Sequence, residues 1–134
     1  MKYLLDTNTC VFLMKNRPEV LARYQQNKQH GIAISSITLS ELKFGVYNSA
    51  LVERNGENLL RFLLGVEVLD YDSAAADEYG GIRVHLRRKG TPIGEMDMLI
   101  AAHARAEALI IVTNNTREFE RVEGLSMEDW TQSL

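Results

Sequence analysis

Four short apolar runs alternate with longer stretches of mixed polarity along the chain. The runs are residues 3–5, 32–36, 66–69 and 109–112, and the last is the richest in β-branched side chains. Short apolar runs bounded by polar residues predict buried strands. Apolar residues at helical spacing between them predict helices over residues 8–15, 18–28, 38–50, 53–64, 73–89 and 95–107, with a shorter helical segment at 117–121.

Glycine, proline and small polar residues divide these elements. Pro18 suits the first turn of a helix, and Gly90 stands where the helix over residues 73–89 should stop. Residues 90–94 are a predicted loop, 113–116 a turn, and 122–126 a further strand at the sheet edge. The alternation of strands and helices predicts an α/β domain with a mostly parallel sheet of four to five strands, covered on both faces.

Length and composition are those of one globular domain over residues 1–134. The chain is 46% hydrophobic and 25% charged, with net charge −3, which argues against a surface coated in positive charge but allows a local basic patch. The single cysteine, Cys10, excludes an internal disulfide and favours a cytoplasmic location. Asp6 interrupts the first apolar run, so we expect no signal peptide, and no run approaches the ~20 residues of a membrane span.

Polar residues follow the predicted strands, at the edge where parallel sheets bind ligands. Asp6 ends the first strand, Glu41 comes soon after the second, and Thr113 and Asn115 follow the fourth. Asp97 opens the helix that leads into the fourth strand. The topology should bring these side chains together at one edge.

Each of these residues also has a simpler local explanation. Asp6 can cap a helix, and Thr38 with Glu41 has the spacing of a capping box. Asp97 can be a first-turn acid favoured by the helix dipole, and Asn115 a turn residue in a left-handed conformation. Singly, these explanations are at least as good as a functional one.

Taken together, the acids indicate a metal site. Carboxylates brought within about 5 Å repel each other unless one gains a proton or a cation sits between them. Oxygen ligands suit Mg²⁺ or Mn²⁺, whereas the histidines are not grouped in a zinc-like spacing. Such a site suits attack of water on a phosphodiester, with Asp6 and Asp97 as ligands and Glu41 holding a water or acting as base. Asn115 and Thr113 would orient a ligand or substrate, and Glu118 would supply a further acid.

Two other segments have both a structural and a functional interpretation. Residues 83–89 are the densest cationic segment, which suits either a solvated helix end or contact with phosphates. Arg117, near the end of the fourth strand, is the better candidate for touching RNA. Residues 59–64 carry apolar side chains on more than one face, either as core or, with Phe44 and Tyr47, as a groove for self-association or a partner helix.

Four segments of the chain together resemble the PIN-domain ribonucleases, specifically the VapC-type toxins of bacterial toxin–antitoxin pairs. The segments are residues 4–8, 36–45, 93–102 and 112–119, and the resemblance extends over nearly the whole chain. It implies a three-layer α/β/α domain and Mg²⁺-dependent endoribonuclease activity. Asp6, Glu41 and Asp97 match the family's acidic triad. Asn115 stands where many PIN domains have a fourth Asp, which puts a second metal in doubt.

The resemblance also implies partners. VapC toxins dimerise and are silenced by a VapB-type antitoxin, for which the groove at residues 59–64 is the candidate contact. DNA binding would come through the antitoxin and not through this chain. The segments around Asp6 and Asn115 are most similar to the enteric branch, whose members cut initiator tRNA in the anticodon stem-loop.

Two alternatives to a nuclease remain open from sequence. Haloacid-dehalogenase-type phosphatases also begin with a strand and an Asp, but they place a second Asp two residues later, where this chain has Asn8. A non-catalytic PIN module that binds RNA or protein is disfavoured because such modules lose acids that this chain keeps.

Overall fold

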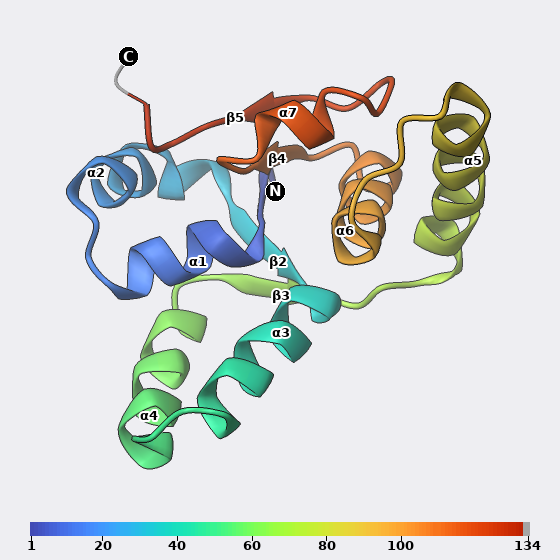
Figure 1. The fold of residues 1–134 in the computed structure, drawn as a ribbon. Helices are drawn as coiled ribbons and strands as arrows, with labels where there is room; N and C mark the ends of the chain where they lie inside the picture. The colour runs from blue at the N-terminus through green and yellow to red at the C-terminus, as the bar shows by residue number, and fades with distance from the viewer. Residues whose placement is uncertain (133–134) are drawn as a thin grey trace.

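A computed structural model describes residues 1–132 of the chain as five parallel strands surrounded by helices (Figure 1). The strands are β1 (Tyr3–Leu5), β2 (Ile32–Ser35), β3 (Glu67–Leu69), β4 (Ile110–Val112) and β5 (Met127–Glu128). The helices are α1 (Thr7–Met14), α2 (Pro18–Asn27), α3 (Ser36–Tyr47), α4 (Val52–Leu63), α5 (Ser73–Lys89), α6 (Glu95–Ala106) and α7 (Thr116–Phe119), with a 3₁₀ turn, η1 (Lys28–His30). Within residues 1–132, no helix is long and apolar enough to cross a membrane.

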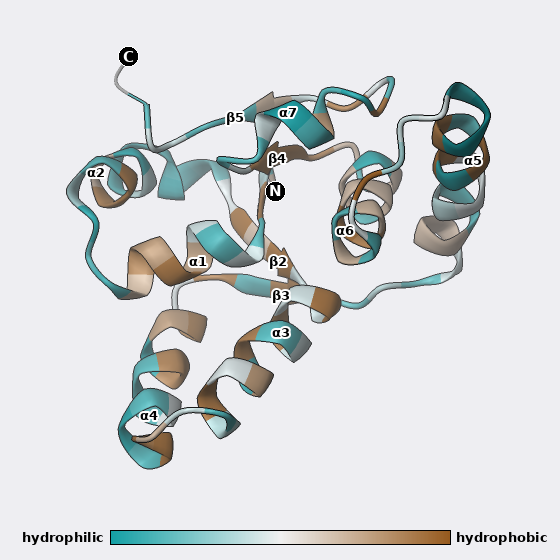
Figure 2. Cartoon of the chain, in the orientation of Figure 1, coloured by the Kyte–Doolittle hydropathy of each residue, from teal (hydrophilic) through white to brown (hydrophobic). Residues whose placement is uncertain are grey.

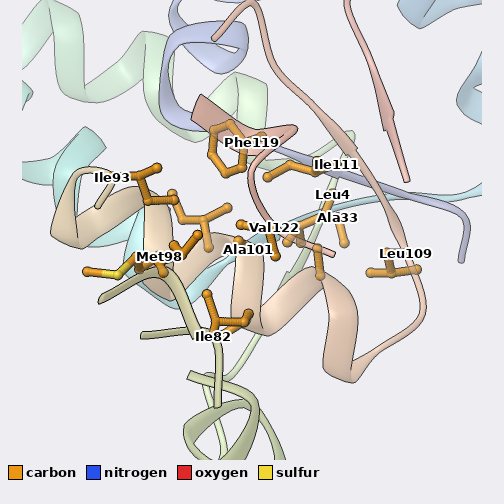
Figure 3. Close-up of a cluster of buried hydrophobic side chains, with 14 residues drawn as sticks. Leu4, Ala33, Ile82, Ile93, Met98, Ala101, Leu109, Ile111, Phe119 and Val122 are labelled. Carbon is orange, nitrogen blue, oxygen red and sulfur yellow. The ribbon is translucent and has the colours of Figure 1, made fainter. Parts of the chain in front are cut away.

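The sheet separates two hydrophobic cores, because successive side chains of a strand point to opposite faces. Leu4 packs with residues of α5, α6 and α7, while Tyr3 and Leu5 pack with residues of α1 to α4. Figure 3 shows the first of these cores, where strand residues such as Ile111 meet Ala101 of α6 and Phe119 of α7. Figure 2 shows β1, β2 and β4 as the hydrophobic centre of the molecule. This arrangement confirms the predicted three-layer α/β/α fold.

The strand order β3-β2-β1-β4-β5 places β1 at the centre, between β2 and β4. Leu5 is in register with Ile34 on one side and Val112 on the other. The residues that follow these three positions therefore emerge at the same edge of the sheet. After β1 the chain continues to β2 on one side of the sheet, and after β4 it continues to β5 on the other side. The position between β1 and β4 is therefore the topological switch point, where parallel α/β sheets bind ligands.

The prediction of a strand at residues 122–126 is wrong. Val122 is buried in the core, and Gly124 then adopts a positive φ of 73° that turns the chain. The fifth strand comes later, at Met127–Glu128, and pairs with β4. The remaining elements lie within a few residues of their predicted bounds, and α5 ends at Gly90 in a left-handed conformation, as predicted.

Candidate active site

Asp6 occupies the centre of the strand-end edge and is almost fully buried, with 4% of its surface exposed. Its Oδ1 atom accepts a hydrogen bond from the Thr9 amide at 2.9 Å, so it caps α1. Burial raises the pKa of Asp6, and the negative charge of Glu41 adds to this effect. Hydrogen bonds from Thr113 and Thr9 act in the opposite direction, since they stabilise the carboxylate.

Glu41 reaches the edge from α3 and is held there by α1. The Thr7 hydroxyl donates a hydrogen bond of 2.6 Å to Oε1 of Glu41. The alternative explanation, a capping box of Thr38 and Glu41, is wrong because Ser35 caps α3 by accepting a hydrogen bond from the Ile37 amide. Glu41 therefore has no role in starting its own helix.

Asp97, Asn115 and Glu118 form a connected group beside Asp6. The Asn115 side-chain amide donates to Oδ2 of Asp97 at 3.2 Å and to Oε2 of Glu118 at 2.9 Å. The Asn115 backbone amide donates to the Thr113 hydroxyl at 2.9 Å, which ties this group to the end of β4. Asn115 has a φ of −94°, so the alternative explanation, a turn residue in a left-handed conformation, is wrong.

The two acids of this group shift each other's pKa in opposite directions. Burial, together with the hydrogen bond and negative charge of Glu118, raises the pKa of Asp97 to about 7. The hydrogen bond from Asp97 in turn lowers the pKa of Glu118. Asp6 also raises the pKa of Asp97, so negative charges from three elements meet here. At neutral pH this cluster needs a proton or a cation to offset its repulsion.

The chemistry of the donors fits a hard divalent ion. All the groups are carboxylate, amide or hydroxyl oxygens, which are the ligands that Mg²⁺ and Mn²⁺ prefer. Gly94 lies beside both Asp97 and Glu118, where a Cβ would make an ordinary van der Waals contact of 3.5 Å with Oδ2 of Asp97. In residues 1–132, however, no three His, Cys, Asp or Glu side chains are already arranged around one point. Asp97 would have to turn toward an ion from its hydrogen bond with Glu118, whereas Thr7 holds only one oxygen of Glu41 and leaves the other for an ion or a water.

The structure places most of the predicted residues at this edge of the sheet. Asp6 lies near enough to Glu41 and to Asp97 for their charges to interact, and Asn115, Thr113 and Glu118 adjoin Asp6 or Asp97. Arg117 is exposed on α7, next to Glu118 in the chain. These residues come from α1, α3, α6, α7 and the end of β4, so only the fold unites them.

Three features of the site had no separate signal in the sequence. The contact of Thr7 with Glu41 spans 34 positions, and Gly94 was assigned only to a loop. Behind the edge, Nδ1 of the buried His103 lies 2.8 Å from the hydroxyl of Ser35, and burial lowers the pKa of His103. A histidine on a helix with apolar neighbours gives no indication of that partner.

The predicted apolar segment at residues 59–64 is part core and part surface. Leu59 is buried at 4% exposure, whereas Leu60 and Leu64 are exposed at 63% and 89%. Phe44 and Tyr47 on α3 are also exposed. Between α3 and α4 lies a groove of about 390 Å³ that we call the α3–α4 groove; it is lined by Lys43, Val46, Tyr47, Val52, Glu53, Gly56, Glu57, Leu59 and Leu60.

Comparisons with known proteins identify the family. Residues 3–125 match the model of the PIN domain. The chain is 52% identical over 132 residues to the tRNA(fMet)-specific endonuclease VapC of Shigella flexneri, covering 98% of this chain and 99% of that protein. It is 50% identical to the protein of the same name from Salmonella typhimurium, covering 97% and 98% of the two chains.

Solved structures agree with this assignment. A chain of the DNA-bound VapBC complex from Salmonella typhimurium has a TM-score of 0.92 at 49% identity, over 97% of this chain and 98% of that chain. A chain of VapBC2 from Rickettsia felis, bound to a promoter fragment, also has a TM-score of 0.92, at 40% identity over 97% and 99%. These matches decide against the phosphatase alternative. The chain belongs to the PIN-domain family, within its VapC group of metal-dependent ribonucleases.

Proposed function

We propose that this protein is a Mg²⁺-dependent endoribonuclease toxin that cuts initiator tRNA in the anticodon stem-loop, with Mn²⁺ as an effective substitute. The names of its relatives in Shigella flexneri and Salmonella typhimurium support the substrate. The observation that carries the chemistry is the convergence of Asp6, Asp97 and Glu118 at one edge of the sheet, where burial and the neighbouring acids raise the pKa of Asp97 to about 7. A cluster that costs this much to ionise is a site prepared for a cation.

Asp6, Glu41 and Asp97 would hold the ion. Asp6 and Asp97 are the direct or water-bridged ligands, and Glu41 holds a water or accepts the proton of the attacking water. When bound, the ion makes water more acidic and neutralises negative charge on the phosphate. Thr7 keeps Glu41 in position, because its hydroxyl donates a hydrogen bond of 2.6 Å to that carboxylate.

The remaining residues of the site would position the substrate and the acids. Asn115 fixes Asp97 and Glu118 through its two hydrogen bonds without adding charge. Thr113 supports Asp6, and Glu118 lies at an outer position where its carboxylate accepts a hydrogen bond from protonated Asp97. Arg117, exposed on α7, would contact an RNA phosphate.

The test is cleavage of total RNA and of an initiator tRNA transcript by the parent and by Asp6→Asn. Asparagine caps a helix as well as aspartate does, so Asp6→Asn should keep α1 while losing the carboxylate. Asp77→Asn, which removes an exposed acid of α5, is the matched control. We expect cleavage by the parent and Asp77→Asn in Mg²⁺ or Mn²⁺, and none by Asp6→Asn or in EDTA.

Mapped RNA ends decide the substrate. A single cut in the anticodon stem-loop of initiator tRNA supports the proposal, whereas cuts spread over many RNAs contradict the tRNA assignment alone. Cleavage that persists in EDTA, or in Asp6→Asn, contradicts the metal site.

We further propose that a VapB-type antitoxin neutralises the protein through the α3–α4 groove. Exposed apolar residues at its rim, Leu60 and Tyr47, offer the kind of surface that an amphipathic helix covers. Leu60→Asp should weaken co-purification with the antitoxin while RNA cleavage by the free toxin is retained. Equal antitoxin binding by the parent and by Leu60→Asp would place the contact elsewhere.

The assembly follows from the same group. We propose a cytoplasmic homodimer in which residues 1–134 form one PIN domain, and in which DNA is bound only through the antitoxin. Light scattering after gel filtration measures the dimer. A mobility-shift assay should show promoter DNA retained by the complex with antitoxin but not by this chain alone.

A further inference from the structure

A concavity of about 540 Å³ opens between the end of α5 and the start of α6. We call it the α5–α6 concavity, and it is lined by Arg83, Leu86, Arg87, Gly90, Pro92 and Met98. Its volume lies in the range of about 300–1,000 Å³ that is typical of small-molecule sites. Its walls are mostly apolar, and the guanidinium groups of Arg83 and Arg87 lie along them. This combination suits a ligand with an apolar part and a negative charge.

The concavity adjoins the acidic site through the backbone. Met98 follows Asp97 directly in α6, and Pro92 lies two residues before Gly94, which flanks the Asp97 carboxylate. Nη1 of Arg121 donates to the carbonyl of Pro92 at 2.9 Å, which fixes the connecting loop against the segment after α7. Figure 1 shows this loop leading from the end of α5 into α6. The loop and the first turn of α6 therefore carry residues of both the concavity and the acidic site.

Both arginines of the concavity lie at the surface, and the partners of Arg83 are two other side chains: Glu95 and the Tyr79 hydroxyl, to which its Nη1 donates at 2.8 Å. Arg87 is exposed and makes no ion pair within the described part of the chain. Arg83 lies 3.6 Å from Glu95, but both side chains are more than half exposed, and such surface pairs contribute little. A phosphate can displace Glu95 from Arg83, because guanidinium binds phosphate in the same bidentate geometry as carboxylate.

We propose that the α5–α6 concavity binds one nucleotide of the RNA strand next to the scissile phosphate. Its base lies against Leu86, Pro92 and Met98, and its phosphate is held by Arg87 and Arg83. Unpaired bases of RNA loops stack on apolar and guanidinium surfaces, and a hairpin loop offers such bases. This inference rests on the proposed RNA cleavage and adds to it a specific binding surface away from the acids.

The competing explanation is that Arg87, Arg88 and Lys89 merely complement the dipole at the end of α5. That explanation makes Arg87 and Arg88 equivalent, since both are exposed cations in the last helical turn. The concavity distinguishes them, because Arg87 lines it and Arg88 does not. Arg88 is thus a matched control within the same helix end.

The experiment compares Arg87→Gln and Arg88→Gln, each in the inactive Asp6→Asn background. The probe is a fluorescein-labelled RNA hairpin with the initiator tRNA anticodon stem-loop sequence, and fluorescence anisotropy gives Kd at several salt concentrations. We expect Arg87→Gln to raise Kd about tenfold, the loss of one charge-assisted phosphate contact, and to lower the slope of log Kd against log salt by about 1. Arg88→Gln should change Kd less than about twofold.

Two further variants separate charge from shape. Arg87→Lys should restore the salt slope but only part of the affinity, because lysine keeps the charge and lacks the planar fork. Arg83→Gln should weaken binding in the same direction as Arg87→Gln. In the active background, Arg87→Gln should raise the KM for the hairpin more than it lowers kcat, as expected of a binding contact.

Three results would overturn the inference. Equal effects of Arg87→Gln and Arg88→Gln on Kd would show that only the general positive charge at the end of α5 attracts RNA, and that the concavity makes no specific contact. Unchanged Kd in Arg87→Gln would exclude an RNA contact. A changed oligomeric state in Arg87→Gln, with RNA affinity unchanged, would assign the surface to a second copy of the chain. If the active parent cuts no RNA, it is the proposed function that fails, which the cleavage assay detects separately.

Discussion

Replacing Asp97 by asparagine should stabilise the metal-free protein while abolishing its activity. In the parent, ionised Asp97 faces the negative charges of Glu118 and Asp6 in a half-buried setting. Asparagine has the same shape, carries no charge, and can accept from Asn115 while donating to Glu118. The substitution therefore removes a repulsion without leaving a hydrogen-bonding group unpaired.

The magnitude follows from the pKa of Asp97. Its rise from 3.8 to about 7 corresponds to at most about 4.5 kcal/mol at pH 8, taking about 1.4 kcal/mol per unit. Partial solvent exposure screens the charges, so we expect Asp97→Asn to raise the free energy of unfolding by about 1–2 kcal/mol. In a domain of this size, this is roughly 3–8 °C in Tm.

The sign of the pH dependence is fixed by the direction of the shift. Because the pKa is raised in the folded state, the stability linked to Asp97 is fully present below about pH 4, and it is lost as the pH rises through about 7. The advantage of Asp97→Asn should therefore be largest at pH 8 and shrink toward pH 4. Saturating Mg²⁺ should raise the Tm of the parent more than that of the variant.

Urea unfolding and thermal melts of parent, Asp97→Asn and the control Asp77→Asn, at several pH values and with or without Mg²⁺, measure these effects. The reasoning is refuted if Asp97→Asn is less stable than the parent at pH 8. It is also refuted if Mg²⁺ stabilises both proteins equally, or if Asp77→Asn gains as much stability as Asp97→Asn.

Three more substitutions test other contacts. Thr7→Val removes the 2.6 Å hydrogen bond to Glu41 and should slow initial rates of RNA cleavage about tenfold with little change in Tm; an unchanged rate would make that bond irrelevant to activity. Asn115→Asp adds a charge beside Asp97, so it should lower the metal-free Tm and tighten Mg²⁺ binding in calorimetric titration; weaker Mg²⁺ binding would contradict an ion at this position. Trp130→Ala empties a site only 1% exposed and should cost about 3–5 kcal/mol in urea unfolding; a loss below about 1 kcal/mol would show that the tail packs loosely.

The architecture could be predicted from the sequence because short apolar runs mark the strands and apolar residues at helical spacing mark the helices. The prediction was wrong after Phe119, where the apolar residues Val122 and Leu125 suggested a strand. In the fold, Val122 is buried in the core and Leu125 packs against it, with the turn at Gly124 between them. A strand of two residues such as β5 has too short a pattern to be found by its period.

At the site, residue types were predictable and contacts were not. The acids could be named because they follow strand ends that a parallel sheet must bring together. Several hydroxyls precede Glu41, and the pattern alone favoured Thr38 as the cap, where the structure has Ser35. The true partner of Glu41 is Thr7, which lies 34 positions away on α1. Such contacts depend on how helices pack, which spacing along the chain does not specify.

The structure also gives the two central acids different roles. Asp6 is buried more deeply, yet the Thr9 amide and the Thr113 hydroxyl stabilise its carboxylate. Only the hydrogen bond from Asn115 stabilises the carboxylate form of Asp97, whereas burial and the charge of Glu118 oppose it. Asp97 is therefore the acid that holds a proton most readily, with its pKa raised to about 7. If Asp6 is a ligand of the ion, as proposed, helix capping and ion binding act together, because the capping hydrogen bond from the Thr9 amide stabilises the carboxylate form of Asp6. In the proposed metal site, a divalent ion that binds near neutral pH would displace the proton of Asp97, so we expect the affinity for the ion to rise with pH through about 7.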